Sequence, residues 1–283
     1  MMRFALRRAA LWCASIFGAA LFASSIAALA VPAAQASTPA YLGTILRELP
    51  RVLVFDPGPS VIDGMPALSA AGPAILASLD LLFVTALIAL LFGALLGAVL
   101  SLRVTRPVTS LLLRIASSVP VFCAALLFAG LAGGLMPPDA VPADPAQLRY
   151  FVPAVLTIGL AGAGAVALSV SRALAIAGRE PYRAGLVRMG LPRGQIFRFY
   201  LAPHAFALVL NDLGSIFLAL FSAAAVVEWI FAWPGAGAAF IRSVALGDWN
   251  VTALLIFVLA LARFTLDLIG TFVSRALLED ATP

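Results

Sequence analysis

Long runs of apolar residues, separated by short polar connections, dominate the pattern along this chain. A helix needs about 20 apolar residues to cross roughly 30 Å of hydrocarbon. Six runs of about this length lie at residues 9–31, 76–102, 114–136, 151–177, 205–231 and 250–274. Because lipid cannot satisfy backbone polar groups, each run is expected to be a helix. The pattern therefore predicts an all-α membrane protein with six transmembrane helices.

The composition supports a membrane location. Hydrophobic residues make up 63% of the 283 residues and charged residues only 11%, against about 25% charged in an ordinary soluble domain. Apolar runs of this number and length cannot all be hidden in one globular core. They are therefore expected to contact lipid or each other.

The distribution of arginine between the runs predicts the orientation in the membrane. One set of connections carries Arg3, Arg7, Arg8, Arg103, Arg106, Arg179, Arg183, Arg188, Arg193, Arg198 and Arg275. The opposite set carries only Arg47, Arg51, Arg149 and Arg242. By the positive-inside rule, both termini are predicted to be cytoplasmic.

The residues available for chemistry exclude several enzyme classes. All 18 basic residues are arginines, so a lysine-containing P-loop and Schiff-base catalysis are both excluded. Cys13 and Cys123 lie inside apolar runs, and His204 is the single histidine, so no metal site is predicted. HExxH and GxSxG motifs are also missing from the sequence. We expect no enzymatic activity and no cofactor bound by this chain.

The first apolar run also imitates a secretory signal peptide. A basic start precedes it, and the small residues of Ala34-Gln35-Ala36 follow it. The run is longer than the roughly 7–15 apolar residues of a signal peptide. It is therefore expected to remain as a transmembrane helix, with cleavage as the alternative.

The chain is expected to divide near residue 74. Residues 1–74 would form the first transmembrane helix and a proline-rich periplasmic connection. In that connection, a short helix on the membrane surface is predicted from the helical spacing of Leu42, Ile45, Leu46 and Leu49. Residues 75–283 would form a five-helix core. Because the other outer connections are short, a separate protein is expected to capture the substrate.

Small residues and one proline predict how the helices pack and bend. Glycines that allow close helix approach recur in three runs, at Gly93 and Gly97, at Gly130 and Gly134, and at Gly159, Gly162 and Gly164. Pro120 removes a backbone donor in the third run and is expected to kink that helix. The kink is either a hinge or a fixed bend.

Four charged residues stand out among those inside the apolar runs. A charge near the middle of the bilayer costs about 2.5–3.5 kcal/mol, so each should face the bundle interior, a partner or water. Arg263 and Asp267 are four residues apart and are predicted to form a structural ion pair. Asp212 is the candidate for a specificity contact, with a contact to a partner subunit as the alternative. Glu228, near the outer end of its span, is placed in the translocation path or at the headgroups.

A basic segment between the fourth and fifth runs is predicted to be cytoplasmic. Residues 179–206 read as two short helices, because Gly190 suits a left-handed helix cap and Pro192 suits a first helical turn. Ile196, Phe197 and Tyr200 give the second helix an apolar side. Such a helix either lies in a groove of a partner protein or is anchored at the lipid headgroups by its arginines.

This segment resembles the EAA loop of ABC importer permeases, which in that family docks on the ATPase. The residues that match the version in the dipeptide, oligopeptide and nickel branch are Arg179, Glu180, Tyr182, Gly190 and Leu191. The sequence departs from the Glu-Ala-Ala pattern at Ala184, Gly185 and Leu186, and has unusual prolines at Pro181 and Pro192. The resemblance implies a coupling loop at about residues 179–204, docking on a specialised ATPase partner.

The resemblance continues through the fifth and sixth runs. The stretch AAAVVEWIFAWPGAGAAFIRSVALGDWNVTALLIF is similar to the same branch without a gap, and the ASSVPVF stretch around Pro120 is similar to its Ser-Leu-Pro turn. The family's MetI-like permease fold is therefore expected. Trp233, Pro234 and Gly235 would form a turn at the outer mouth of the translocation path.

The resemblance implies an inner-membrane permease that forms half of a translocation pathway. The implied partners are a second permease, two cytoplasmic ATPase subunits, a periplasmic or lipid-anchored binding protein and the bilayer, without nucleic acid. Small peptides are the expected substrates, with nickel chelates and other small solutes as alternatives. An ion-coupled secondary transporter is the alternative function, although no internal repeat supports it.

Overall fold

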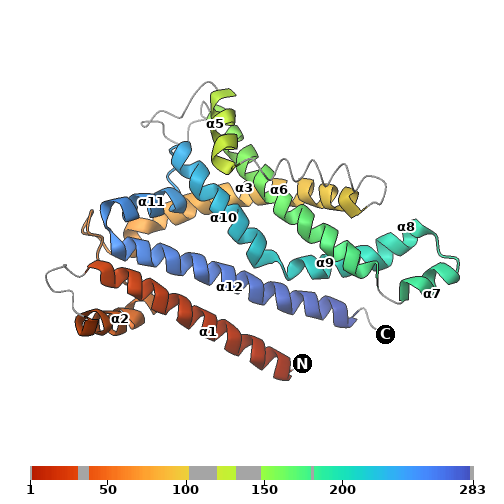
Figure 1. Ribbon diagram of the computed structural model, residues 1–283, viewed down its shortest axis with the longest axis horizontal. Coiled ribbons are helices and arrows are strands. Elements are labelled where there is room, and N and C mark those ends of the chain that lie inside the picture. The colour runs from red at the N-terminus through yellow and green to blue at the C-terminus, as the bar shows by residue number, and fades with distance from the viewer. Residues whose placement is uncertain (1, 31–37, 102–119, 132–147, 180–181, 281–283) are drawn as a thin grey trace.

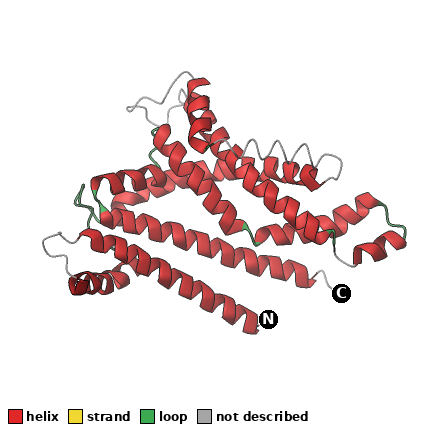
Figure 2. Ribbon diagram, viewed as in Figure 1, coloured by secondary structure: helices red, strands yellow, loops and turns green. Residues whose placement is uncertain are grey.

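The computed structural model describes residues 2–30, 38–101, 120–131, 148–179 and 182–280. The regular elements of these ranges are helices (Figure 2). In chain order they are α1 (Met2–Ala27), η1 (Ala28–Ala30), α2 (Thr38–Leu53), α3 (Ala67–Ser101), α5 (Val121–Leu131), α6 (Leu148–Ala177), α7 (Tyr182–Arg188), α8 (Arg193–Ile196), the π-helical segment η4 (Phe197–Leu201), α9 (Ala202–Leu210), α10 (Leu213–Ile230), α11 (Ala236–Leu246) and α12 (Trp249–Asp280).

Five of the described helices are long and apolar enough to cross a membrane, namely α1, α3, α6, α10 and α12. The third predicted span is represented by the shorter α5, because residues 114–119 and 132–136 lie outside the described ranges. Pro120 directly precedes α5, and its carbonyl accepts from the N–H groups of Cys123 and Ala124. It therefore starts the described helix. Its predicted role as a hinge or kink depends on residues outside the described ranges.

The structure corrects one predicted span and shows a helix in a connection between two others. The run at 205–231 is not one helix, because α9 ends at Leu210 and α10 begins at Leu213. The connection between the fifth and sixth runs is also helical, and forms α11. This helix begins directly after Gly235 and ends at Leu246. The next residue, Gly247, has a φ of 71°, in the left-handed region that favours glycine.

The two ends of the molecule differ in what they carry. Both termini lie toward the end formed by α7 and α8, whereas α2 and α11 lie at the opposite end (Figure 1). This is the arrangement that the predicted topology requires, with both termini and the arginine-rich loop on one side. The long helices α1, α3 and α12 run between the two ends.

Close packing of α3 against α6 forms the centre of the bundle. A Cβ added at Gly93 would lie 2.5 Å from Val166 Cβ, and one at Gly97 would lie 2.7 Å from the carbonyl oxygen of Ala167. The two backbones approach so closely only because these positions carry no side chain. The predicted packing role is thus confirmed for Gly93 and Gly97, and Gly130 and Gly164 have open space instead.

The amino-terminal helix packs along α12 and against α2. Its packed side carries buried Ile16, Ala20, Ala23 and Ala27, which cluster with Phe257 of α12. The hydroxyl of Tyr41 in α2 donates to the carbonyl of Ser25 at 2.7 Å. Leu42 and Leu46 of α2 are exposed while Leu49 packs inward, so α2 is amphipathic. Its location on the membrane surface stays a prediction.

The α3–α6 contact makes a testable prediction. Gly93→Leu is expected to lower the melting temperature of the detergent-solubilised protein, because overpacking a close contact costs about 1–3 kcal/mol. Gly164→Leu is the matched control, since it removes a helical glycine with open space around it. Equal melting temperatures for the two variants would contradict the packing described.

Candidate functional site

The basic loop between α6 and α9 has the predicted form of two short helices. After α7, Gly190 adopts a left-handed conformation with φ of 79°. The N–H of Gly190 donates to the carbonyl of Val187 at 3.1 Å, and the N–H of Leu191 donates to that of Leu186 at 3.2 Å, which closes the helix end. Pro192 then precedes α8 with φ of −64°. Gly190 thus closes the end of α7 and Pro192 leads into α8, as the sequence predicts.

The second short helix does not stop before the membrane span. From α8 the chain passes through η4 directly into α9, without an intervening loop. A π-helical segment inserts an extra residue into a helical turn and rotates the side chains that follow it. As a result, α8, η4 and α9 form one continuous arm.

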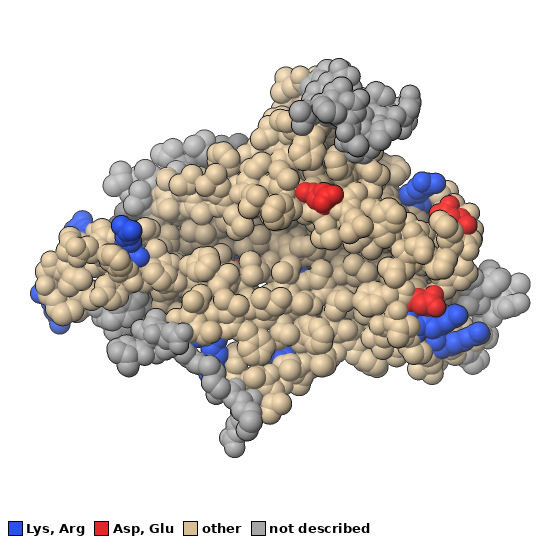
Figure 3. Space-filling view, turned by 180° about the vertical axis from the view of Figure 1, so that it is seen from behind, with Lys and Arg blue, Asp and Glu red and all other residues tan. Residues whose placement is uncertain are grey.

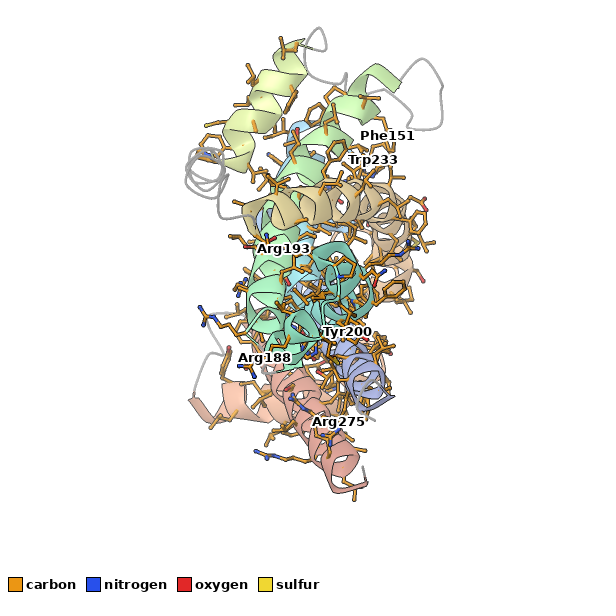
Figure 4. The ribbon with its side chains drawn as sticks, turned by 90° about the vertical axis from the view of Figure 1, so that its right-hand side faces the viewer. Phe151, Arg188, Arg193, Tyr200, Trp233 and Arg275 are labelled. Atoms are coloured by element: carbon orange, nitrogen blue, oxygen red, sulfur yellow. The ribbon has the colours of Figure 1, made fainter. Side chains whose placement is uncertain are left out.

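The exposed residues of this arm and of α7 form a surface that is both apolar and basic. We call it the loop surface, and it consists of Val187, Arg188, Met189, Arg193, Phe197, Arg198, Phe199 and Tyr200. Met189 is 69% exposed and Phe199 is 62% exposed. The guanidinium of Arg198 lies over the Phe199 ring at 5.6 Å. Figure 4 shows Arg188, Arg193 and Tyr200 at this end of the molecule.

The predicted coupling residues are placed unevenly on this surface. Phe197 is exposed, but Ile196 is buried against the protein, so the two do not share one exposed apolar side as predicted. Their part in docking stays a prediction. Neighbouring residues on a helix point about 100° apart, which separates these two side chains. Val187, Met189 and Phe199 are exposed on the loop surface, and the periodicity alone did not single them out.

The other predicted loop residues lie along the same segment. Arg179 is exposed after the end of α6, and Gly185 of α7 has open space around it. Tyr182 and Ala184 lie on α7, and Glu180 lies outside the described residues, as does Pro181.

At the opposite end of the molecule, Glu228 holds three elements together. Its side chain is 0% exposed. Ser78 of α3 donates to Oε1 at 2.5 Å, and the N–H groups of Gly237 and Ala238 donate to Oε2 at 2.7 and 3.2 Å. Ser78 Oγ also accepts from the N–H of Ala236 at 2.7 Å. A carboxylate and a hydroxyl thus satisfy the free N–H groups at the start of α11.

In the turn before α11, residues without a side chain allow the backbone to approach the Glu228 carboxylate closely. A Cβ at Gly235 would collide with the carboxylate of Glu228, and one at Gly237 would lie 2.6 Å from Ala225 Cβ. Ala232 has a positive φ of 53°. Trp233 donates from Nε1 to the carbonyl of Ala77 at 3.1 Å. Its ring centroid is 5.6 Å from that of Phe151, and the two side chains lie together in Figure 4.

A second buried carboxylate at this end, Asp248, is absent from the predicted sites. Its Oδ2 accepts from Ser60 Oγ at 2.5 Å, and its Oδ1 accepts from the N–H of Val251 at 3.3 Å. It therefore caps α12 and fixes the 55–66 connection. The Gly247-Asp248 pair, directly before an apolar run, is a helix-cap pattern that sequence reasoning had available.

The end of the molecule that carries Glu228 also holds a cavity of about 550 Å³ between α3, α10, α11 and the start of α12. Trp229, Trp233 and Pro234 supply apolar walls, and Asp63 and Arg242 line it as charged residues. The predicted residues Glu228, Trp233, Pro234 and Gly235 all line this cavity. The hydrogen bonds of Glu228 are internal, and its part in the translocation path stays a prediction.

The break between α9 and α10 explains the placement of Asp212. Ser169 of α6 donates to Asp212 Oδ2 at 2.6 Å, and the Nδ2 of Asn211 donates to Ser274 Oγ of α12 at 3.0 Å. The half-buried Asp212 thus ties this break to α6. The bond from Ser169 gives Asp212 a structural role. A specificity contact by Asp212 stays a prediction.

The intramembrane pair is formed as its four-residue spacing predicts. Arg263 Nη1 contacts Asp267 Oδ2 along one face of α12. The pair lies against Gly214 of α10, where a Cβ would collide with both side chains. Because Gly214 has no side chain, α10 can pack against α12 at the position of the ion pair.

Another acidic residue within an apolar span is absent from the predicted sites. Asp80 is exposed on α3 and lines a groove of about 540 Å³ between α3, α10 and Leu266 of α12. Because a charge inside an apolar run is visible in the sequence, Asp80 could have been named as a candidate from the sequence alone.

The buried Glu228 carboxylate makes a prediction about stability. Glu228→Gln places an amide where N–H groups point, so a buried donor loses its partner at a cost of about 1–3 kcal/mol. We expect a lower melting temperature in detergent for Glu228→Gln. Glu48→Gln, on α2 where Glu48 pairs with exposed Arg51, serves as the control and is expected to change it little. A wild-type melting temperature for Glu228→Gln would contradict the capping role.

The ion pair makes a second prediction. Arg263→Ala leaves Asp267 charged and unpaired inside the membrane, which is unfavourable. We expect this variant to accumulate less in membranes than Arg263→Ala combined with Asp267→Ala. Quantitative immunoblotting of membrane fractions measures both. If the single variant accumulates as well as the double variant, the pairing is not structural.

Comparison with known proteins agrees with this architecture. The family described as "Binding-protein-dependent transport system inner membrane component" matches residues 67–279, about three quarters of the chain. The described fold resembles the crystal structure of an amino acid ABC transporter with histidines, with a TM-score of 0.53 and 17% identity over 72% of this chain and 92% of that chain. At this identity the likeness concerns the fold alone. No curated protein matches.

The family match spans α3 to α12, and thus covers the loop surface, the Glu228 assembly and the intramembrane pair. The apolar helices fit a multi-pass protein of the inner membrane. The chain belongs to the family of inner-membrane components of binding-protein-dependent transport systems, and is a permease component of an ABC importer.

Proposed function

We propose that this chain forms one half of a translocation pathway and that its loop surface receives the motion of a separate ATPase. A second permease would form the other half, and two cytoplasmic ATPase subunits would bind and hydrolyse ATP. A binding protein on the outer side would deliver the solute. The chain itself would bind neither ATP nor another cofactor.

The observation that carries this proposal is the exposed loop surface. Large apolar side chains such as Met189 and Phe199 stand among arginines there, at the end of the molecule that also holds both termini. Exposed apolar patches of this kind mark interaction sites. A short helix with an apolar face suits the groove of a partner protein. Anchoring at lipid headgroups is the competing explanation, and membership of an ABC importer family favours the ATPase.

The arm provides a route from this surface to the spans. It ends at Leu210, whose carbonyl lies directly against Gly270 of α12. The next two residues, Asn211 and Asp212, bind Ser274 of α12 and Ser169 of α6. Displacement of the loop surface would therefore move α6 and α12 together with α9. Such coupled movement of packed helices is the rigid-body switching by which a pathway changes its open side.

The solute is proposed from sequence resemblance alone. Residues 223–257 are similar to the dipeptide, oligopeptide and nickel branch, which favours small peptides, with nickel chelates as the alternative. The amino acid transporter is too distant in sequence to indicate the solute. An ion-coupled secondary transporter is not favoured, since the matched family works with a binding protein.

The conformation of Gly190 gives the test of this proposal. Gly190→Val places a β-branched residue at a φ of 79°, which L residues avoid at a cost of about 1–2 kcal/mol. The loop should rearrange, and the amount of ATPase that co-purifies with the tagged chain is expected to fall about tenfold, the change that roughly 1.4 kcal/mol produces.

The control is Gly43→Val on α2, where the glycine is exposed and has open space around it. This variant should retain the wild-type amount of ATPase. Both variants should reach the membrane at similar levels, because neither glycine contacts the packed spans. Full ATPase recovery with Gly190→Val would contradict the proposed docking site.

A further inference from the structure

The cavity beside Glu228 is lined by two opposite charges that have no protein partner. Asp63 of the 55–66 connection and Arg242 of α11 both line it, and both side chains are exposed. Within the described ranges, neither side chain takes part in a hydrogen bond or an ion pair, and the two do not pair with each other. The buried Glu228 and Asp248 also line the cavity, but both accept hydrogen bonds from the protein itself. Asp63 and Arg242 are therefore the charges available to a bound molecule.

The backbone around this cavity places it in contact with water. One wall belongs to the 55–66 connection, in which residues 61–66 are all exposed. Another wall is the turn at residues 232–235, between α10 and α11. Exposed irregular backbone does not occur within hydrocarbon, because lipid leaves its N–H and C=O groups without partners. The cavity thus opens at the membrane surface. Figure 3 shows basic and acidic side chains gathered at this end of the molecule, on the right of the view.

Apolar and aromatic side chains supply much of the remaining wall. Trp229 is 54% exposed, and Trp233, Pro234 and Val251 also line the cavity. Aromatic rings attract ammonium groups and also contact apolar bodies. Sites for small molecules combine apolar walls with a few polar groups in a volume of roughly 300–1,000 Å³. The cavity has this composition and, at about 550 Å³, this size.

The turn between the two tryptophans has an unfavourable backbone conformation. Ala232 lines the cavity, is exposed, and has a φ of 53°, in the region that residues with a side chain rarely adopt. Strained residues of this kind cluster at ligand sites, where the surrounding structure holds them in place. Here the strained turn leads from Trp229 to Trp233, so that both rings line the same cavity.

We infer that this cavity binds a small zwitterionic solute, with its carboxylate on Arg242 and its ammonium group on Asp63. A guanidinium can donate two parallel hydrogen bonds to a carboxylate, and a carboxylate accepts from an ammonium group. A solute with a single charge would use one of the two residues alone. The tryptophans would contact the apolar part of the solute, which makes the class free amino acids or short peptides with apolar side chains.

This inference rests on the proposed function in one respect. The proposed function makes the bound molecule the transported solute, and makes the cavity its first contact with this chain on the outer side. Binding itself follows from the charges and walls of the cavity, and is measured without transport.

Ligands with blocked charges test the inference. The whole complex in nanodiscs, without binding protein, is titrated with leucine and with the dipeptide Leu-Leu, and saturation-transfer difference NMR detects weak binding. Each ligand is compared with its N-acetyl form, which lacks the cation, and with its carboxamide, which lacks the anion. We expect at least one of the two unblocked ligands to bind. Each of its blocked forms should bind about tenfold more weakly, since it loses one charge-assisted contact.

Two variants assign the contacts to their residues. With Asp63→Asn, the N-acetyl form should bind as well as the unblocked ligand, while the carboxamide stays weaker. With Arg242→Gln, the carboxamide should bind as well as the unblocked ligand, while the N-acetyl form stays weaker. Glu48→Gln and Arg51→Gln, which alter an ion pair on α2 outside the cavity, are the matched controls and should retain both differences.

Three outcomes would overturn the inference. If neither unblocked ligand binds, the cavity is not a site for such a solute. If the blocked forms bind as tightly as the unblocked ligand, the charges do not take part. If Asp63→Asn and Arg242→Gln leave both differences unchanged, the ligand binds elsewhere in the complex. None of these outcomes bears on ATPase docking, which the co-purification of the Gly190→Val variant tests separately.

Discussion

The hydrocarbon interior offers no water to the polar groups of the spans, and this constraint determines where the helices of this protein break and turn. Each charged or polar group must find a partner within the protein or face a wet surface. Glu228 satisfies the start of α11, Asp248 satisfies the start of α12, and Asp212 joins the break after α9 to α6. These bonds allow the chain to leave regular helix inside or beside the membrane without leaving backbone groups unsatisfied.

Polar contacts of this kind also connect the loop surface to two of the spans. The loop surface belongs to an arm that runs through η4 into α9, and the arm ends where Asn211 and Asp212 bind two different spans. A force applied at the loop surface therefore reaches α6 and α12 through hydrogen bonds and through the contact of Leu210 with Gly270.

Local patterns predicted much of this fold, whereas contacts between distant segments were beyond them. Apolar run length identified the long helices, Gly190 and Pro192 identified the form of the loop, and four-residue spacing identified the Arg263–Asp267 pair. The bonds from Ser78 to Glu228 and from Ser60 to Asp248 join residues more than a hundred positions apart, and no periodicity reports them. Likewise, the burial of Ile196 depends on how the arm lies against the protein.

Photo-cross-linking from Phe199 tests most directly whether the loop surface binds an ATPase. A photoreactive amino acid at this exposed position of η4 would be activated in intact membranes, with Leu246 of α11 as an equally exposed control at the opposite end. We expect a covalent adduct with an ATPase subunit from position 199 and none from position 246. Adducts from position 199 to lipid alone would show that the loop surface anchors the protein at the headgroups and does not bind an ATPase.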